Sequence, residues 1–599
     1  MKILYPTRDN AYIVPDQWEW EREIARLAGR PEPEAPSIAH FRVIGSRAVV
    51  TLSDQDVAKM KIPKITPKGV EGILLGYEGT HMYVPMRWVF KVKLDGKYKA
   101  RLVARGDRQK EGIDYNKEFA STAHTDSWRI LMSCAVATGR VVRQADITAA
   151  YLHGIIREDV YVRPPTELQT YFEQFPEAGK KVVFAPGLVI KLRRTLYGLR
   201  QSGHEWQQVL KSNLKDMGFH QIPCDPATYR DDVRDMTVCS HVDDLLYDGP
   251  DERTVKEFKR DLCKRFHTNL SEVPKWHLGV NLAFNPNSIS LDQITLFEDI
   301  LEEAGMQNCK PSQTPAELPA PCPWQEKEDD TEDHELEKQL ADRYRRLVGR
   351  MMYASTMTRP DIAYALGRLV AAFKAPKQSD NKALTKLLQY LSTNKSFKIV
   401  YTAPTKQPRH KPIRCYMYTD ATWVDGPDGR STSGIIIFIA GGPVMWMCKR
   451  QKVVARSSLE SELISMSEGI AAATYAKNFA SAIGHTLEIE VYADNKGGIS
   501  TANKPDATSK ATRHITASDM YIRDKVADGT AKLGYVSTKQ QIADALTKPL
   551  SGPLVEKYNK VMFGGLDPHT HLVTGPWQPE KDTHLMVRGV GVAWRQQRT

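Results

Sequence analysis

Two regions in which β-rich runs alternate with helical stretches, separated by a segment unsuited to a hydrophobic core, most strongly limit how this chain can fold. The first runs from Tyr83 to about Thr314 and the second from about Ile413 to Pro549. Between them, prolines in PAELPAPCPW give way to the acidic block QEKEDDTEDHELE, and a helical region follows from Tyr344 to about Ser392. Because one core seldom grows beyond roughly 250–300 residues, the 599 residues are expected to form several domains.

The charge balance favours a polyanionic partner. The formal net charge is +11 and the pI is near 9.0, and Lys and Arg gain affinity for nucleic acids by releasing phosphate counterions. A basic protein without such a partner fits the charge equally well. No apolar run approaches the ~20 residues of a membrane helix, so no membrane partner is expected. The eight cysteines include no CxxC pair, which argues against a zinc site and favours reduced, mostly buried thiols.

Three aspartates of the first region stand at predicted strand ends. In RVVRQADITAAYLHG the residues Val141, Val142 and Ala145 predict a strand leading into Asp146, and in TVCSHVDDLLYDG a tight hairpin can carry Asp243 and Asp244. Adjacent acids in an apolar stretch repel each other and cost desolvation energy, which bound divalent cations would offset. Nucleotidyl transfer uses two such ions about 3.5–4 Å apart. For an Asp-Asp pair alone, the alternative is an exposed, solvated turn.

Acids of the second region occur in four separate settings. Asp420 follows an apolar strand in CYMYTDATW, and Asp494 follows the alternating strand LEIEVYA. Asp544 lies near the start of a predicted last helix in QQIADALTKPL. The fourth setting is a predicted helix in RSSLESELISMSEGI, which contains two glutamates. Each acid taken alone is more often a surface residue, so only the set as a whole indicates a site.

Helical geometry distinguishes the two glutamates. Ser457 or Ser458 is expected to cap the helix, and residues 459, 463, 466 and 470 form one apolar stripe. Glu462 borders this stripe at about 60°, whereas Glu460 lies roughly 100° away. Glu462 is therefore expected to face the sheet edge that carries Asp420, and Glu460 to lie at the surface.

Ordered sequence blocks extend over roughly residues 83–550. They are WVFKVKLDGKYKARLVARGDRQ, QADITAAYLHG, LRRTLYGLRQSGHEW, HVDDLL, WHLGVNL, RRLVGRMMYASTMTRPDIAYALGRL, TDATW, ADNKGG and IADALTKP. In this order they resemble the reverse transcriptase and ribonuclease H region of copia-type (Pseudoviridae) long-terminal-repeat retrotransposon polyproteins. A match of many ordered blocks is more specific than any one motif.

The resemblance implies a multidomain fold of α+β and α/β type. A right-hand polymerase with fingers, palm and thumb is expected over 61–314, and an acidic linker with a helical connection over 315–410. An RNase H-like mixed-sheet domain is expected over 411–550. Residues 1–60 are expected to form a partly disordered N-terminal extension, and 551–599 a loosely ordered C-terminal tail.

The resemblance also implies the metal ligands. Two Mg²⁺ ions, for which Mn²⁺ can substitute, are expected in each of two active sites. The polymerase ligands would be Asp146, Asp243 and Asp244, and the nuclease ligands Asp420, Glu462, Asp494 and Asp544. His514 matches a family histidine that assists product release, with a structural role as its alternative. His241 replaces the usual Tyr of the family's YVDD motif, which leaves metal binding intact but puts packing against the primer terminus in doubt.

Four residues are implied to contact substrate. Tyr151 matches an aromatic ring below the incoming sugar, which would favour dNTPs by excluding a 2′-hydroxyl. Lys93 and Arg101 lie on a basic hairpin and would hold the triphosphate, and Gln201 would lie near nucleotide and template. The alternatives are a core aromatic for Tyr151 and a solvated β-ribbon for the two cations.

The sequence thus predicts an RNA-directed DNA polymerase with ribonuclease H activity. Its expected partners are an RNA template, a DNA primer, the RNA–DNA hybrid and dNTPs, with integrase or capsid proteins of the same element as further candidates. The resemblance implies a location in cytoplasmic virus-like particles and the nucleus. The competing hypotheses are an inactive retroelement remnant that only binds nucleic acid, and an enzyme with nuclease activity alone.

Overall fold

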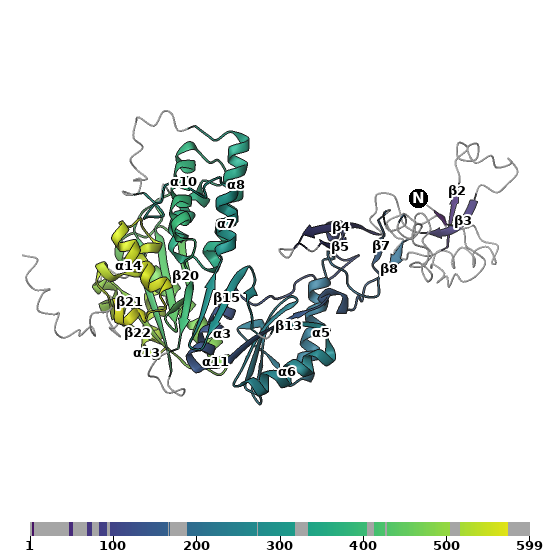
Figure 1. The fold of residues 1–599 in the computed structure, drawn as a ribbon, viewed down its shortest axis with the longest axis horizontal. Helices are drawn as coiled ribbons and strands as arrows, with labels where there is room; N and C mark the ends of the chain where they lie inside the picture. Colours follow the sequence, from purple (N-terminus) through teal and green to yellow (C-terminus); the bar gives the residue numbers. More distant parts are fainter. Residues whose placement is uncertain are drawn as a thin grey trace, which may run out of the picture. The chain divides into compact units, whose positions relative to one another are not determined.

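The computed structural model describes residues 83–572, with gaps at 93–95, 97, 166, 168–169, 171–188, 272, 318–333, 404–411, 426–427 and 503–515, together with three N-terminal strands. It divides into two compact units, each of which is described by itself (Figure 1). The first comprises Met1–Ser121 and Ala149–Asn213, and the second Thr122–Thr148 and Leu214–Thr599. Most of the expected N-terminal extension, much of the acidic linker, residues 573–599, Lys93 and His514 lie outside the described residues.

The first unit contains two small sheets. One has the strand order β1-β3-β2, from β1 (Ile3–Leu4), β2 (Arg47–Thr51) and β3 (Gly69–Leu74). The other has the order β5-β4-β7-β8, from β4 (Val84–Val92), β5 (Tyr98–Ala104), β7 (Tyr161–Arg163) and β8 (Ile190–Lys191). Short 3-10 turns at Gly106–Arg108 and Ala150–His153 and most of α5 (Ser202–Asp216) complete the unit. A small apolar core holds it together, formed by Val84, Ala104, Val160, Val162 and Leu199.

A close approach between two backbone segments fixes the base of the β4–β5 hairpin. The Gly106 amide donates to the Gly198 carbonyl at 3.0 Å. Gly198 has a φ of +92°, and a Cβ there would lie 2.1 Å from the Ala104 carbonyl oxygen. Only glycine fits both the conformation and the space, so the LYGLRQ segment docks against the strand end through its backbone.

The second unit begins with a six-stranded sheet of order β13-β6-β12-β11-β10-β9. Its strands are β6 (Val141–Ile147), β9 (His220–Ile222), β10 (Asp225–Asp231), β11 (Met236–His241), β12 (Asp244–Gly249) and β13 (Thr268–Ser271). Helix α3 (Thr125–Thr138) ends at Gly139, which adopts a left-handed conformation. Helix α6 (Glu252–Arg265) is capped by Asp251, whose side chain accepts from the Thr254 amide. The strand expected before Asp146 is confirmed by β6.

A four-stranded sheet and a group of helices follow. The sheet has the order β14-β15-β16-β17, from β14 (Trp276–His277), β15 (Val280–Asn285), β16 (Ser288–Asp292) and β17 (Ile399–Thr402). The helices are α7 (Ile294–Glu303), α8 (Lys338–Met357), α9 (Ala363–Ala371) and α10 (Gln378–Asn394). These confirm the helical region expected between Tyr344 and about Ser392.

The C-terminal part contains a five-stranded mixed sheet of order β20-β19-β18-β21-β22. Its strands are β18 (Ile413–Thr422), β19 (Thr432–Ile439), β20 (Gly442–Arg450), β21 (Leu487–Ala493) and β22 (Ala531–Tyr535). The pairs β18–β21 and β21–β22 are parallel and the other pairs antiparallel. The helices are α11 (Ser458–Ala482), α12 (Lys496–Ala502), α13 (Thr516–Ala527), α14 (Gly552–Phe563) and α15 (Pro568–Leu572), with a 3-10 turn, η7, at Ile542–Leu546.

One continuous hydrophobic core runs through the second unit, from α3 to α14. The expected boundaries at 314 and 410 are therefore not boundaries of packing. The expected tail is also wrong for residues 552–563, because α14 buries Val555, Tyr558, Val561 and Met562. Its apolar residues are interrupted by Glu, Lys and Asn, which hid the amphipathic pattern from the sequence reading.

Side chains within this core tie α3 to the C-terminal sheet. Arg129, 2% exposed, donates to the carbonyl oxygens of Val444, Thr356 and Met357 at 2.8, 2.7 and 2.9 Å. Its guanidinium also lies 4.2 Å from the Trp446 ring centroid. The Arg129 side chain of α3 thus satisfies backbone carbonyls of α8 and β20.

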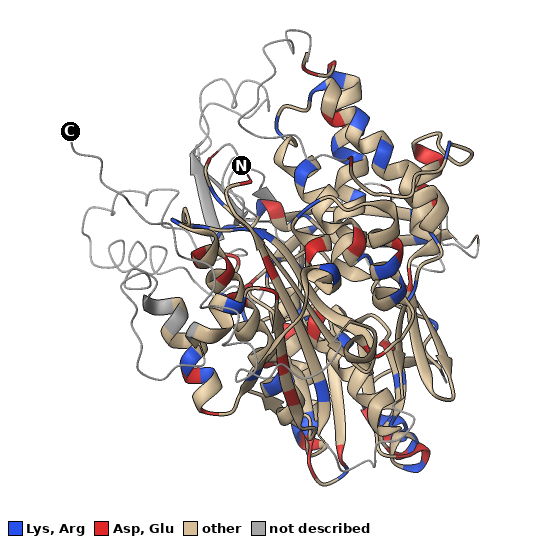
Figure 2. Cartoon of the chain, turned by 90° about the vertical axis from the view of Figure 1, so that its left-hand side faces the viewer, with Lys and Arg blue, Asp and Glu red and all other residues tan. Residues whose placement is uncertain are grey.

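The expectations about membrane helices and about cysteines can be compared with the described residues. No helix among them is long and apolar enough to cross a bilayer. Seven cysteines are described and all are free thiols, with Cys134, Cys239 and Cys415 buried. Lys and Arg are interspersed with Asp and Glu along the ribbon in Figure 2.

Candidate active sites: two carboxylate clusters

The first cluster lies at the junction of β6 with the β11–β12 hairpin. Asp146 on β6 pairs directly with Asp244 on β12, and Asp243 occupies the two-residue turn between β11 and β12. The Ile147 amide donates to the Asp243 carbonyl at 2.8 Å. The tight hairpin expected for the Asp-Asp pair is therefore present, and it brings both acids to the end of the strand that carries Asp146.

The turn that carries Asp243 is strained. Val242 has a φ of 59°, a left-handed conformation that a β-branched residue rarely adopts. Such strain persists only where surrounding structure holds it and is common at functional sites. Here the β11–β12 and β6–β12 pairings hold both sides of the turn.

Polar neighbours and repulsion shape the first cluster. Asn269 donates to Asp146 at 3.1 Å, and Gln144 donates to Asp244 at 3.3 Å. Burial, together with the charges of Asp243 and Asp146, raises the pKa of Asp244 to about 6. A divalent cation would relieve this repulsion and suits carboxylate oxygens, so the three residues fit a metal ion.

His241 pairs with Asp244 across the hairpin. Burial lowers the pKa of His241 despite the nearby Asp243 charge, and its Nδ1 has no hydrogen-bond partner among the described residues. The ring is therefore neutral near pH 7 and adds no positive charge beside the acids.

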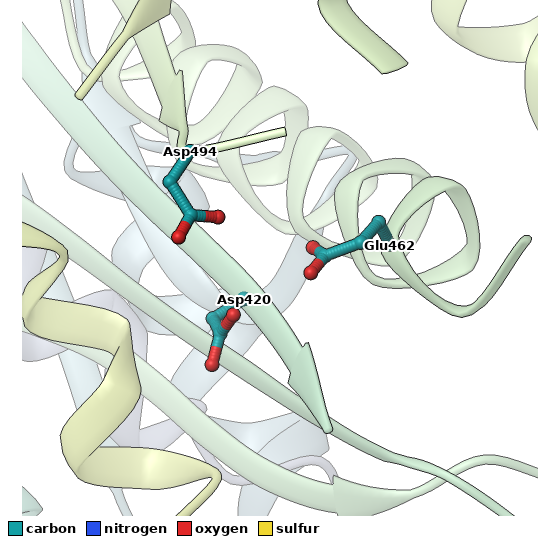
Figure 3. Close-up of side chains that lie close together, drawn as sticks. All are labelled: Asp420, Glu462 and Asp494. Carbon is teal, nitrogen blue, oxygen red and sulfur yellow. The ribbon is translucent and has the colours of Figure 1, made fainter. Parts of the chain in front are cut away.

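The second cluster lies at the C-terminal sheet and joins three of the four acids expected there. Ligand oxygens of Asp420, Glu462 and Asp494 all lie within 4.8 Å of one another. Figure 3 shows the three carboxylates pointing toward a common space, from β18, α11 and the end of β21. It is the one such group of three or more acidic, His or Cys side chains found among the described residues.

Helix α11 presents Glu462 as its pattern predicted. The Ser457 side chain accepts from the Glu460 amide and caps the helix. Leu463, Met466 and Ile470 are buried as expected. Glu460 is half-buried, is not part of the cluster, and accepts from the Arg456 amide at 2.7 Å. Glu462 is 9% exposed, and its Oε2 has no hydrogen-bond partner within the described structure.

Asp544 lies on the 3-10 turn η7, not at the start of a longer helix as expected, since α14 begins only at Gly552. Gly434 on β19 permits this placement, because a Cβ there would lie 2.5 Å from Thr547 Cγ2 and 2.9 Å from the Ala543 carbonyl oxygen. The buried Gln541 amide also donates to the Thr419 carbonyl at 2.9 Å. These contacts fix η7 beside the strand that carries Asp420.

Lys548 holds Asp544 to the cluster. Its Nζ lies 2.9 Å from Asp544 Oδ1 and 3.4 Å from Asp420 Oδ2. Thr547 donates through its hydroxyl to Asp420, and Thr538 donates to Asp494 at 2.8 Å. Sequence reasoning missed these three residues, although two of them follow Asp544 closely in the IADALTKP block.

Burial and like charges raise the pKa values of the second cluster. Burial, then the charges of Asp420 and Asp494, raises the pKa of Glu462 well above its ordinary value. Burial and Asp420 raise the pKa of Asp544 in the same direction, although Lys548 opposes the change. Burial also raises the pKa of Asp494. Crowded carboxylates with an unpaired buried oxygen are the ligand set that hard divalent cations require, so the cluster fits Mg²⁺ or Mn²⁺.

The expected substrate residues lie in the first unit. Tyr151 and Tyr197 pack edge to face at 4.9 Å between ring centroids, and the exposed Arg101 guanidinium lies 5.3 Å from the Tyr197 centroid. Gln201 is 1% exposed; it accepts from Gln109 at 3.1 Å and donates to the Asp114 carbonyl at 2.9 Å. Its amide is therefore used within the unit.

Comparisons with known proteins agree with the sequence blocks. Residues 76–318 match the family described as reverse transcriptase (RNA-dependent DNA polymerase). The chain is 32% identical over 474 residues to the retrovirus-related Pol polyprotein from transposon TNT 1-94 of Nicotiana tabacum, which covers 77% of this chain and 34% of that protein. It is 31% identical over 480 residues to the polyprotein from transposon RE1 of Arabidopsis thaliana, covering 78% and 31%.

More distant matches lie in yeast and among solved structures. The Ty1-GR2 Gag-Pol polyprotein of Saccharomyces cerevisiae is 24% identical over 483 residues, covering 77% of this chain and 26% of that protein. The chain thus spans about a third or less of the length of these relatives. A foamy viral protease-reverse transcriptase, solved in complex with RNA/DNA hybrid, matches 76% of this chain and 50% of its own, at 12% identity and a TM-score of 0.39. That likeness is too weak to establish the fold.

Proposed function

Since the chain belongs, through residues 76–318, to the reverse transcriptase (RNA-dependent DNA polymerase) family found in transposon Pol polyproteins, we propose that it copies RNA into DNA and cleaves the RNA of the resulting hybrid. The observation that carries the second activity is the convergence of Asp420, Glu462 and Asp494 within 4.8 Å. The first activity rests on the family and on the pairing of Asp146 with the Asp243–Asp244 hairpin.

In the polymerase site, Asp146, Asp243 and Asp244 would hold the divalent ions. When bound, a pair of Mg²⁺ ions activates the primer 3′-hydroxyl and stabilises charge on the triphosphate. The protein's own contribution is placement: strands β6 and β12 fix two acids side by side, and the strained turn at Val242 fixes the third. His241, neutral near pH 7, leaves the negative charge of the site undiminished.

In the nuclease site, Asp420, Glu462, Asp494 and Asp544 would hold the ions that activate water and stabilise the leaving 3′-oxygen. Thr547, Thr538 and Gln541 orient these acids or the elements that carry them. Because the acids are crowded together before any ion binds, the ligand set is organised in advance, which favours metal binding at small conformational cost.

The first unit would supply nucleotide contacts. Arg101 is exposed on β5, and we propose that it binds the triphosphate together with Lys93. Tyr151 would contact the sugar and exclude a 2′-hydroxyl. Gln201 acts instead as a positioning residue, because its buried amide already links Gln109 to the Asp114 backbone.

The partners would be an RNA template, a DNA primer, their hybrid and dNTPs. Recognition would rest on backbone charge and duplex shape, because neither chemistry depends on base identity. Integrase or capsid proteins of the same element, and a location in cytoplasmic particles and the nucleus, belong to the same proposal.

The direct test is dNTP incorporation on poly(rA)/oligo(dT) with Mg²⁺ or Mn²⁺, beside an Asp243→Asn, Asp244→Asn double variant. Extension by the unaltered chain alone supports the polymerase. No extension, combined with tight and salt-sensitive hybrid binding, would replace it with the inactive nucleic-acid-binding remnant.

A further inference from the structure

Building on the nuclease activity proposed above, we propose that Lys548 is a built-in cation of the C-terminal cluster. In the metal-free protein its ammonium occupies the position between Asp420 and Asp544, and it must leave that position before a second divalent ion binds. The enzyme at rest would therefore hold one metal ion, and the second would enter only when Lys548 is displaced.

The contacts divide the four acids into two cation positions that share Asp420. Three acids, Asp420, Glu462 and Asp494, converge within 4.8 Å of one another. Asp544 is not part of that group, and its Oδ1 instead lies 2.9 Å from Lys548 Nζ. The same ammonium lies 3.4 Å from Asp420 Oδ2. One ammonium thus bridges carboxylates from β18 and η7, as a divalent ion would bridge them.

The backbone around Lys548 is fixed, while its side chain can move. The Lys548 amide donates to the Asp544 carbonyl at 3.1 Å, and the Thr547 carbonyl accepts from the Thr422 hydroxyl at 2.9 Å. The Lys548 side chain is 38% exposed. A flexible four-carbon stem lets an ammonium swing toward solvent without backbone movement, so displacement would cost only side-chain contacts.

The positive charge of Lys548 has two electrostatic effects on the cluster. Four crowded carboxylates without a cation repel one another, and Lys548 offsets part of that repulsion until the ions and substrate arrive. A divalent ion at the same position would be repelled by the ammonium. The simpler alternative is a permanent structural ion pair, in which Lys548 stays in place and does not influence how many ions bind.

The two alternatives differ in a Mn²⁺ titration followed by calorimetry and by electron paramagnetic resonance. The full chain would carry Asp243→Asn and Asp244→Asn, so that the polymerase acids contribute little. With Lys548 present, one ion is expected to bind without hybrid. In Lys548→Met, a second ion is expected to bind without hybrid, about tenfold more tightly than it binds to the parent. The two ions should then show the spin coupling of a close ion pair.

The matched control is Lys539→Met. Lys539 follows Thr538, which contacts Asp494, so this variant removes the same charge near the cluster without touching Asp544. It should bind Mn²⁺ as the parent does. Equal ion numbers and affinities in Lys548→Met and its parent would overturn the inference. If Lys548→Met does not fold, Lys548→Gln, which keeps most of the stem, provides the same comparison.

Thermal unfolding gives a second readout. Metal-free Lys548→Met should melt at a lower temperature than its parent and gain more from saturating Mn²⁺, because ligand binding stabilises the folded state. An Asp420→Asn variant separates two failures. If it binds Mn²⁺ like its parent, the metal cluster and the proposed nuclease both fail. If it loses the ion while Lys548→Met behaves like the parent, only the role of Lys548 is refuted.

Discussion

The two carboxylate clusters differ in how completely the protein assembles them. At the C-terminal sheet, oxygens of three acids lie within 4.8 Å, and Thr538, Thr547 and Lys548 hold the set from the side. At the β11–β12 hairpin, the backbone places the acids, but their side chains turn to Asn269 and Gln144 and form no such group within the described structure.

This difference follows from where the clusters lie. The C-terminal acids come from β18, α11, η7 and the end of β21, and Asp420, Glu462 and Asp544 among them are buried. The hairpin acids stand at a sheet end, where they have polar neighbours and can rotate. The C-terminal cluster is thus organised before metal binding, whereas the hairpin cluster would complete its geometry when metal and nucleotide bind.

The largest expected effect separates the two clusters. Glu462→Gln should reduce hybrid cleavage about a thousandfold, since metal stabilisation of the transition state is worth several kcal/mol, and should leave dNTP incorporation within about twofold. Asp244→Asn should do the reverse. Glu460→Gln, two residues away on the same helix, is the control and should cleave at nearly the parental rate. Equal losses in Glu460→Gln and Glu462→Gln would refute the assigned geometry.

The next effect concerns the core that joins the clusters. Arg129→Met should lower the free energy of unfolding by about 3 kcal/mol, because it leaves buried carbonyls unpaired and removes a buried charge from Asp126. Urea unfolding measures it.

Arg345→Met is the matched control. Arg345 also donates to two carbonyls and pairs with an aspartate, but is more exposed, so a loss of at most about 1 kcal/mol is expected. A separate transition for the C-terminal sheet, unaffected by Arg129→Met, would show that the second unit does not share one core.

Protonation should also differ between the two clusters. Burial and like charges raise the pKa of Glu462 and Asp544 more than that of Asp244, which rises to about 6. Near pH 7, metal binding should therefore release roughly one proton or more from the C-terminal cluster and almost none from the hairpin cluster. Mn²⁺ titrations in buffers of different ionisation enthalpy measure this in variants with one cluster disabled.

The same shifts set the sign of the stability change. A carboxyl whose pKa is raised in the folded state ionises first in the unfolded chain, so the metal-free protein loses stability as pH rises above about 4 toward the raised pKa values. Divalent ions should reduce that loss. Metal-free stability that increases over this range would contradict the raised pKa values.

The smallest expected effect is at His241. Because the ring is neutral and the His241–Asp244 pairing depends on the backbone, His241→Tyr should change dNTP incorporation by no more than about threefold, a range below 1 kcal/mol. Steady-state kinetics of dNTP incorporation by His241→Tyr and its parent, on the same primer–template, would measure this change. A change of more than about thirtyfold would mean that this side chain takes part in catalysis.

Much of the site could be predicted from the periodicity of apolar residues and from the order of the sequence blocks. The strand before Asp146, the hairpin at Asp243 and Asp244, the Ser457 cap and the choice of Glu462 over Glu460 all follow from local pattern. What local pattern misses is packing between distant segments. Neither Lys548 nor Gly434 stands out in the local sequence, yet together they set the surroundings of Asp544.

In the fold, too, the local elements were predictable but the packing between distant segments was not. Alternating and helical stretches predicted the elements, but not that α14 completes a core reaching back to α3. Arg129 illustrates why: its partners Thr356 and Val444 lie 227 and 315 residues away in sequence. No window of residues reveals such a contact, and so the expected domain boundaries did not coincide with the packing.

The most direct test of the central claim is cleavage of an end-labelled RNA strand paired with DNA, using the full chain with Mg²⁺ beside Asp420→Asn. Fragments should form from the hybrid but not from duplex RNA, and Asp420→Asn should abolish them while dNTP incorporation continues. Cleavage that persists in Asp420→Asn, or no cleavage by a chain that incorporates dNTPs, would contradict a nuclease built on the C-terminal cluster.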